Sequence, residues 1–347
     1  MNLAIRNEDD DLMDFLLFNA ETRSSYNSAW PRLNLETMSD TQIVNNFRFQ
    51  LDDLPRLQRA LAIPDTMKFS ERTVSSGLEA LCVVLRRLAY PNRLCDLEQL
   101  FGRPKCSISV ICNETIDYLH ENWCHLLTEM NQKFLDQAHL QSYSDAVMAC
   151  GAPLENCFGF VDGTVRPLCR PIELQREVWN GHKRCHSIKF QSLVLPNGLI
   201  ANMFGPHTGR RHDCALLRES RLLEKLEGLP LDENGEPYVI YGDPAYPIRR
   251  QLVMPFKGNI TQEQRNFNAS MSSVRESVEW TFGKILAEFA FLDYRKDLKV
   301  FLQPVAKYYL IGALLTNCHT FLYGGIVPSY FNLSPPELEE YLDANRN

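Results

Sequence analysis

The sequence predicts an α/β fold in which a mixed β-sheet is flanked by helices and follows an all-helical region. Two changes of hydrophobic pattern indicate this order. Between about residues 70 and 150, apolar residues recur at intervals of three and four, as in amphipathic helices. From residue 157 onward, short apolar runs bounded by turn residues indicate strands, and helical spacing returns after residue 270.

Four strands and one intervening helix define the predicted sheet. The expected strands are 158–161, 187–195, 199–204 and 238–241, and the expected helix between the last two is 213–226. Three strands in a meander, a helix and a fourth strand that ends in an acid are the order of an RNase H-like core. Further helices are expected at 272–291 and 298–322.

Composition limits the class of protein. A chain of 347 residues, 45% of them hydrophobic, can form about two domains with sizeable cores. No apolar run approaches the roughly 18 residues of a membrane span, and residues 1–11 are too acidic for a signal peptide, so we expect an intracellular protein. The 11 cysteines are scattered without a C-x-x-C pair, which favours free thiols over a zinc or redox site.

A helix-turn-helix pattern precedes the strands. Helical spacing covers 70–88, 94–101 and 107–123, and the turn 102–105 contains Gly and Pro. The second helix of such a motif would carry Lys105 and Ser107 toward DNA, followed by Ser109 and Asn113. A plain helical hairpin is the alternative interpretation.

Three carboxylates are the candidate catalytic residues. Asp162 and Asp243 each follow a short apolar run that is typical of a buried strand, and Glu279 lies in a strongly helical segment. Acids at strand ends lie at the rim of a sheet, and a helix across that sheet can bring a third acid beside them. Carboxylates are the ligands that Mg²⁺ and Mn²⁺ prefer, and a pair of such ions can promote phosphodiester cleavage.

The helix that carries Glu279 is predicted in detail. Ser273 and Glu276 match a capping box, which would start the helix there. Val274, Val278, Phe282, Ile285 and Phe289 would form its buried stripe. Glu279 lies beside that stripe, with Arg275 one turn before it and Gly283 one turn after it. A solvated Glu279 paired with Arg275 is the alternative to a metal ligand.

Asp213 and two basic turns complete the candidate site. Asp213 begins a predicted helix, so it is either an N-cap or a fourth metal ligand. Arg210 and Arg211 precede it, and Lys183 and Arg184 lie in another basic turn. These four cations are predicted contacts to DNA phosphates, with solvated turns as the alternative.

Charge and pattern together divide the chain. Residues 1–65 carry a net charge of −5 and residues 328–347 a net charge of −3, out of −7 in total, so the middle of the chain carries about +1. The predicted regions are an acidic N-terminal arm (1–66), a helix-turn-helix-like DNA-binding region (67–150), an RNase H-like catalytic domain (151–327) and an acidic C-terminal tail (328–347). A basic excess between residues 162 and 215 suits a phosphate-binding surface.

Five runs resemble the PIF/Harbinger transposases, a DDE endonuclease family that includes the Harbinger-derived nuclease of animals. The runs are Phe160–Thr164, Asn180–Arg184, Gly209–Asp213, Tyr241–Pro247 and Val278–Gly283. The resemblance covers roughly residues 68–325; Trp179 departs from it, since Tyr is more usual there. It implies a DDE triad of Asp162, Asp243 and Glu279, with Asp213 as auxiliary ligand or cap, and Mg²⁺ (or Mn²⁺) as cofactor.

The expected function is therefore that of a metal-dependent DNA endonuclease or transposase. The resemblance implies double-stranded DNA with terminal inverted repeats and a target site as substrate. It also implies a Myb-like partner protein for DNA binding and nuclear entry. We expect a homo-oligomer with no membrane association, nuclear or held in the cytoplasm until imported with a partner. Two alternatives are a domesticated DNA-binding or scaffold protein without turnover and a phosphohydrolase of small substrates.

Overall fold

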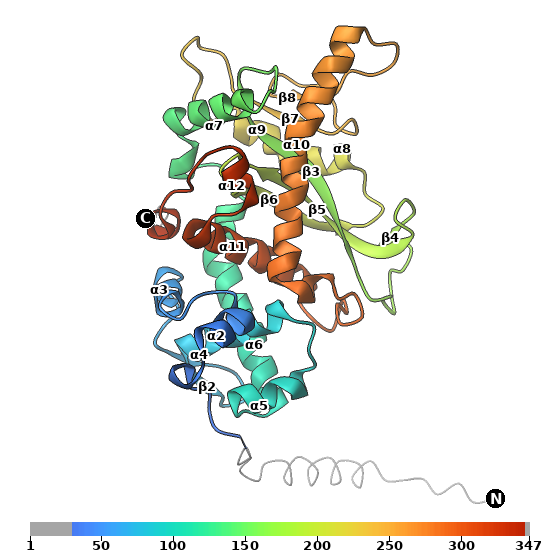
Figure 1. Ribbon diagram of the computed structural model, residues 1–347. Helices are drawn as coiled ribbons and strands as arrows, with labels where there is room; N and C mark the ends of the chain where they lie inside the picture. Colours follow the sequence, from blue (N-terminus) through green and yellow to red (C-terminus); the bar gives the residue numbers. More distant parts are fainter. Residues whose placement is uncertain (1–29, 344–347) are drawn as a thin grey trace, which may run out of the picture.

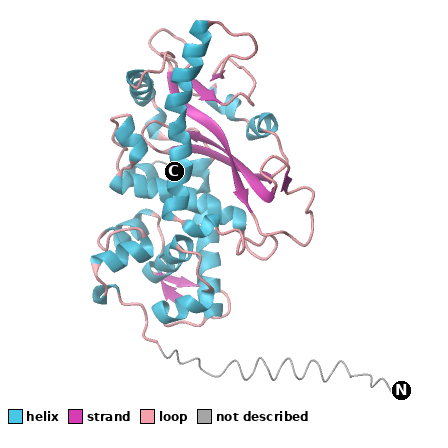
Figure 2. Ribbon diagram, turned by 45° about the vertical axis from the view of Figure 1, so that its right-hand side comes forward, coloured by secondary structure: helices cyan, strands magenta, loops and turns pink. Residues whose placement is uncertain are grey.

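The computed structural model describes residues 30–343, so the first 29 residues of the predicted arm and the last four of the predicted tail lie outside the described part. In Figure 1 the N-terminal helices lie below, and the larger sheet with its helices lies above. Figure 2 shows the strands of that sheet grouped together with helices around them. The predicted class, a mixed sheet flanked by helices, is confirmed.

The described part of the predicted acidic arm is folded onto the helical region. It contains η1 (Leu35–Thr37), α2 (Asp40–Phe47) and α3 (Asp53–Ala60), and both α-helices contact α4 (Gly77–Ala89). The side chains buried by α2 and α3 include Ile43, Phe47, Leu54 and Leu57. Residues 30–66 thus pack onto the helical region, because these apolar residues are spaced to bury one face of each helix.

Helix α4 is the centre of the helical region. The other elements here are β1 (Thr66–Lys68), β2 (Val74–Ser76), η2 (Leu94–Leu97), α5 (Glu98–Phe101), α6 (Lys105–Trp123) and η3 (Cys124–Leu127). Ser76 caps α4 by accepting a hydrogen bond from the Glu79 amide. Ten of the 13 residues of α4 are buried, since α2, α3 and α6 all pack against it.

The predicted helix-turn-helix segment is occupied by α5 and α6. Helix α5 is a single turn, and α6 packs against both α4 and α11 (Val305–Tyr323). Asn113, predicted to face DNA, instead accepts a hydrogen bond of 2.6 Å from the Tyr308 hydroxyl of α11. Lys105 is exposed and Ser107 half-buried at the first turn of α6. Much of α6 is therefore used in contacts within the chain, and DNA reading by its first turn stays a prediction.

The larger sheet has six strands of mixed direction. They are β3 (Cys157–Pro167), β4 (Trp179–Asn180), β5 (Cys185–Val194), β6 (Ile200–Thr208), β7 (Val239–Gly242) and β8 (Leu252–Val253). The order across the sheet is β4-β5-β3-β7-β8, and β6 pairs with β5. Strands β3, β5 and β6 pair antiparallel, whereas β7 runs parallel to β3 and to β8. The four predicted strands are all present, in the predicted meander with the fourth beside the first.

The first predicted strand is longer than expected. The expected strand ends at Val161, but β3 continues to Pro167 because these later residues still pair with β5. The parallel neighbour β7 stops at Gly242, opposite Val161. Asp162 is therefore not at the end of its own strand. It is the first residue of β3 after the last pair with β7, so the edge of β3 that faces β7 is unpaired from there on.

Helices pack on the sheet and join it to the helical region. They are η4 (Lys133–Leu135), α7 (Gln137–Ala149), α8 (Asp213–Ser220), α9 (Leu222–Leu226), α10 (Gln262–Glu288), η5 (Ala290–Asp293), α11, α12 (Ile326–Tyr330) and α13 (Leu338–Asp343). Helix α10 crosses in front of the sheet in Figure 1 and contacts β3 and β7. The predicted helix 213–226 is split into α8 and α9, because Arg221 takes a φ of 51°.

Two predicted helix starts are corrected. Helix α10 begins after Thr261, which forms a capping box with Gln264, so Ser273 and Glu276 lie inside the helix. A Ser-x-x-Glu pattern also occurs within helices, and spacing alone does not distinguish the two positions. Helix α11 begins after Pro304 rather than at residue 298. The buried stripe of α10 is confirmed, since Val274, Val278, Phe282, Ile285 and Phe289 are all buried.

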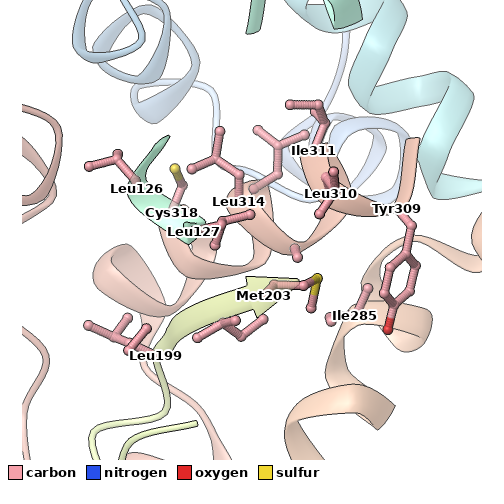
Figure 3. Close-up of a cluster of buried hydrophobic side chains, with 14 of the residues drawn as sticks. Leu126, Leu127, Leu199, Met203, Ile285, Tyr309, Leu310, Ile311, Leu314 and Cys318 are labelled. Carbon is pink, nitrogen blue, oxygen red and sulfur yellow. The ribbon is translucent and has the colours of Figure 1, made fainter. Parts of the chain in front are cut away.

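One hydrophobic core spans the helical region and the sheet. Figure 3 shows one part of it, where α11 packs against η3 and β6. The side chains labelled there are Leu126, Leu127, Leu199, Met203, Ile285, Tyr309, Leu310, Ile311, Leu314 and Cys318. Helix α11 has most of its residues buried because it lies between α6, α10 and β6.

The described part of the predicted acidic tail also packs on the body. Leu338, Tyr341 and Leu342 of α13 are buried, and Glu339 accepts hydrogen bonds of 2.6 and 2.7 Å from Arg56 of α3. Among residues 30–343, no helix combines the length and apolar character needed to cross a membrane.

Candidate active site at the end of β7

The parallel pairing of β3 and β7 brings Asp162 and Asp243 together. Its register sets Val161 opposite Gly242, and each acid is the next residue on its chain. Neighbouring strands are about 4.8 Å apart, so these two acids start from adjacent positions. Both are half-buried. The register therefore brings the backbones of these two acids to neighbouring positions.

Hydrogen bonds orient each of these carboxylates. Asp162 Oδ1 accepts from the Gly163 amide at 2.8 Å, and Asp162 Oδ2 accepts from Arg275 Nη1 at 3.3 Å. Asp243 Oδ1 accepts from the Ala245 amide at 2.8 Å, in the turn that follows β7. Arg275 thus pairs with an acid on β3 rather than with Glu279, the partner that the sequence analysis considered.

Glu279 approaches the same place from α10. It is exposed and lies one helical turn after Arg275, on the helix that contacts β3 and β7. Burial raises the pKa of Asp162 to about 6, opposed by Arg275 and the Gly163 amide, and the charges of Asp243 and Glu279 raise it further. The charges of Asp243, Glu279 and Arg275 therefore all act on Asp162.

Asp213 packs against β3 at Gly163, the residue after Asp162. Its Oδ1 accepts a hydrogen bond of 2.6 Å from Lys189 of β5, and a Cβ added to Gly163 would lie 2.8 Å from the same oxygen. Asp213 is the first residue of α8, whose N-cap is His212, and neither makes a side-chain cap bond. The helix-cap interpretation of Asp213 was therefore wrong, because the side chain turns to Lys189 instead.

Tyr246 is a residue of this site that the sequence analysis did not single out. Its side chain is 2% exposed, and its hydroxyl has no hydrogen-bond partner among the described residues. Burial, followed by the charges of Asp213, Asp162 and Asp243, raises the pKa of Tyr246 well above its ordinary value. Tyr246 is thus a buried tyrosine on which the charges of all three acids act, within the run Tyr241–Pro247 that carried the resemblance.

Tyr246→Phe is expected to leave the metal-free protein equally stable or up to about 1 kcal/mol more stable. A buried hydroxyl without a partner loses its hydration and gains nothing in return. Thermal unfolding in EDTA measures this, with Tyr238→Phe as the matched control. Tyr238 donates a 2.9 Å hydrogen bond to Gln141, so its loss should cost about 1 kcal/mol. A loss of stability for Tyr246→Phe as large as that of the control would contradict the prediction.

The two predicted basic turns are tied together at the β4 edge of the sheet. Asn180 is buried and donates a hydrogen bond of 2.7 Å to the Gly209 carbonyl, which links the turn before β5 to the turn after β6. Lys183, Arg184 and Arg210 are exposed. Arg211 is also exposed but pairs with Glu219 of α8. Lys105 and Ser107 are not part of this surface, since α6 belongs to the helical region (Figure 1).

The donor set suits a hard divalent cation bound through pairs of acids. Asp162, Asp243 and Glu279 supply only carboxylate oxygens, and their negative charges exceed the one positive charge of Arg275. Within residues 30–343, no three His, Cys, Asp or Glu side chains are placed to hold one ion between them. Mg²⁺ commonly takes one or two carboxylates and completes its shell with water and substrate phosphate, so two acids such as Asp162 and Asp243 are enough in number for one ion.

Comparison with known proteins agrees with this chemistry. Residues 161–317 match the sequence profile of the family described as DDE superfamily endonuclease. The matched segment begins one residue before Asp162 and includes Asp213, Asp243 and Glu279. The searches among curated proteins and among solved structures gave no match. Residues 161–317 of this chain are therefore similar to the DDE superfamily endonuclease domain.

Proposed function

We propose that the protein is a divalent-metal-dependent DNA endonuclease or transposase of the PIF/Harbinger type, which cleaves phosphodiesters at element ends by a two-metal DDE mechanism. The observation that carries the proposal is the adjacency of Asp162 and Asp243 past the last paired residues of β3 and β7. Glu279 supplies the third acid from α10, and all three lie within the segment that matches the endonuclease family.

Asp162 and Asp243 would hold Mg²⁺ or Mn²⁺, and Glu279 would hold a second ion. Such ions supply an activated nucleophile and stabilise the charge on the leaving oxygen. The chain's own residues set the geometry, because Arg275 and the Gly163 amide fix the Asp162 carboxylate and the turn after β7 fixes that of Asp243. Burial of Asp162 strengthens its attraction for a cation.

The exposed cations of the basic turns are the proposed contacts to DNA phosphates. Lys183, Arg184 and Arg210 would bind the backbone of double-stranded DNA beside the acids, and Lys105 and Ser107 would contact it from the helical region. Arg211 would contribute less, because it already pairs with Glu219. The proposed substrate is DNA with terminal inverted repeats and a target site. The proposal also includes a Myb-like partner protein, homo-oligomerisation and a nuclear location.

Cleavage of a DNA library tests the proposed function. The purified protein is incubated with end sequences of varied composition and Mn²⁺, with EDTA as the control. Cleavage that needs the metal and selects particular ends is the expected result. Binding of DNA without cleavage of any end would favour a domesticated DNA-binding or scaffold protein. Hydrolysis of nucleotides but not of DNA would favour a small-substrate phosphohydrolase.

The double substitution Lys183→Ala and Arg184→Ala is expected to weaken DNA binding about tenfold at low salt, without changing sequence preference. Each phosphate contact removed should lower the slope of log affinity against log salt by about one. Fluorescence anisotropy over a salt series measures both quantities. Arg250→Ala is the matched control, since Arg250 is an exposed cation next to β8 and outside the basic turns. An equal loss in the control would show that general charge, and not this surface, sets the affinity.

A further inference from the structure

Lys189 and Asp213 form a partly buried ion pair that the proposed chemistry does not use. Lys189 Nζ lies 2.6 Å from Asp213 Oδ1, and the two side chains are 10% and 23% exposed. Lys189 also donates to the Arg211 carbonyl at 3.0 Å. Removing two charges from water costs several kcal/mol, so such a pair is weak evidence for stability and better evidence for fixing a position.

The backbone of β3 separates this pair from the predicted metal ligands. Successive residues of a strand point to opposite faces. The Asp162 carboxylate bonds Arg275 of α10, whereas the missing Cβ of Gly163 would point at Asp213 Oδ1, 2.8 Å away. Asp213 therefore packs directly on the strand backbone from the α8 side. Glycine at 163 is what allows this close approach.

The contacts of Asp213 oppose a role as ligand. A ligand on the same ions as Asp162 would present its oxygens on the α10 side of β3. Oδ1 instead accepts from Lys189, on the side that Gly163 faces. Lys189, the partner of Asp213, lies on strand β5, and β5 pairs with β3 along this stretch. The pair thus connects α8, β5 and the backbone next to Asp162.

We infer that Asp213 is a positioning residue and not a metal ligand. Held by Lys189, its carboxylate supports the β3 backbone at Gly163 and so fixes the direction of the neighbouring Asp162 side chain. The inference rests on the proposed function, because it takes Asp162 and Asp243 to be the metal-binding acids. It assigns Lys189 to the same supporting role.

Isothermal titration with Mn²⁺, in the absence of DNA, distinguishes a positioning residue from a metal ligand. The two roles predict opposite changes in Mn²⁺ affinity for Lys189→Met. If Asp213 supports the strand, Lys189→Met and Asp213→Asn should each weaken Mn²⁺ binding about tenfold, as loss of an outer partner does. The double variant should lose no more than either single one, since both act through one contact. If Asp213 were a ligand, Lys189→Met would remove a competing cation and tighten Mn²⁺ binding.

Each other outcome also decides the matter. Tighter binding by Lys189→Met, additive losses of about a hundredfold in the double variant, or wild-type affinity in all three variants would overturn the inference. The double variant contains no unpaired buried charge, so it stays informative where a single variant does not fold, as judged by circular dichroism. Asp243→Asn is titrated in parallel. Wild-type affinity there would show that the proposed metal site itself is wrong.

Discussion

Asp243→Asn is expected to lower metal-dependent DNA cleavage by well over a hundredfold, more than the roughly 10–100-fold that loss of an outer-shell partner costs. The substitution removes one negative charge, so that only Asp162 and Glu279 would be left to balance the positive charge of the ions. The amide is also a poorer ligand for a hard cation. The substitution keeps the side-chain volume. Its oxygen can still accept the hydrogen bond from the Ala245 amide, so the turn after β7 should persist.

Single-turnover cleavage of a preferred end sequence in Mg²⁺ and in Mn²⁺ measures this loss. Asp293→Asn is the matched control, because Asp293 is an exposed acid in η5 and, among residues 30–343, no side-chain bond ties it to the site. The control should cleave at the wild-type rate, and both variants should unfold at nearly the wild-type temperature. Undiminished cutting by Asp243→Asn would refute the assignment of this acid.

The sequence contained enough information to predict the pair of acids but not their partners. Asp162 and Asp243 follow short apolar runs, and a parallel neighbour that stops at Gly242 leaves both acids at one place. Arg275 is four residues before Glu279 on a helix, which made a pair on that helix a reasonable expectation. The crossing of α10 over β3 turns Arg275 to Asp162 instead. The spacing of residues within one helix does not predict the angle at which that helix crosses a sheet.

Lys189 carried a signal that could have been used. It is the one cation in the predicted strand 187–195, and a Lys within an otherwise uncharged strand needs a buried partner. Asp213 could have been sought as that partner. The prediction of a cap considered only the helix that Asp213 begins, and caps depend on backbone geometry that a sequence does not show. Residues 30–66 show a similar limit, because net charge says little about which apolar side chains find a core.

Asp162→Asn is expected to stabilise the metal-free protein at neutral pH by about 2–3 kcal/mol, although it should abolish metal binding. Asp162 has a folded-state pKa of about 6, above its ordinary value of 3.8, chiefly because it is buried. Between these two pH values the folded protein binds more protons than the unfolded chain, so stability falls as pH rises through this window. Asparagine resembles the protonated acid, so its advantage should be largest above pH 6 and vanish near pH 4.

Thermal and urea unfolding in EDTA at pH 4, 5, 6 and 7.5 measure this difference. Asp293→Asn is the control: it keeps Asp162, so its stability should follow that of the wild type at each pH. A variant less stable than the wild type at pH 7.5 would mean that the Arg275 ion pair outweighs burial. In the expected case, where Asp162→Asn is the more stable protein in EDTA, adding Mn²⁺ should make the wild type the more stable one. Only the wild type gains binding free energy from the ion. A carboxylate kept at a cost to stability, whose charge a divalent cation would satisfy, is what a metal-binding site requires and a purely structural ion pair does not.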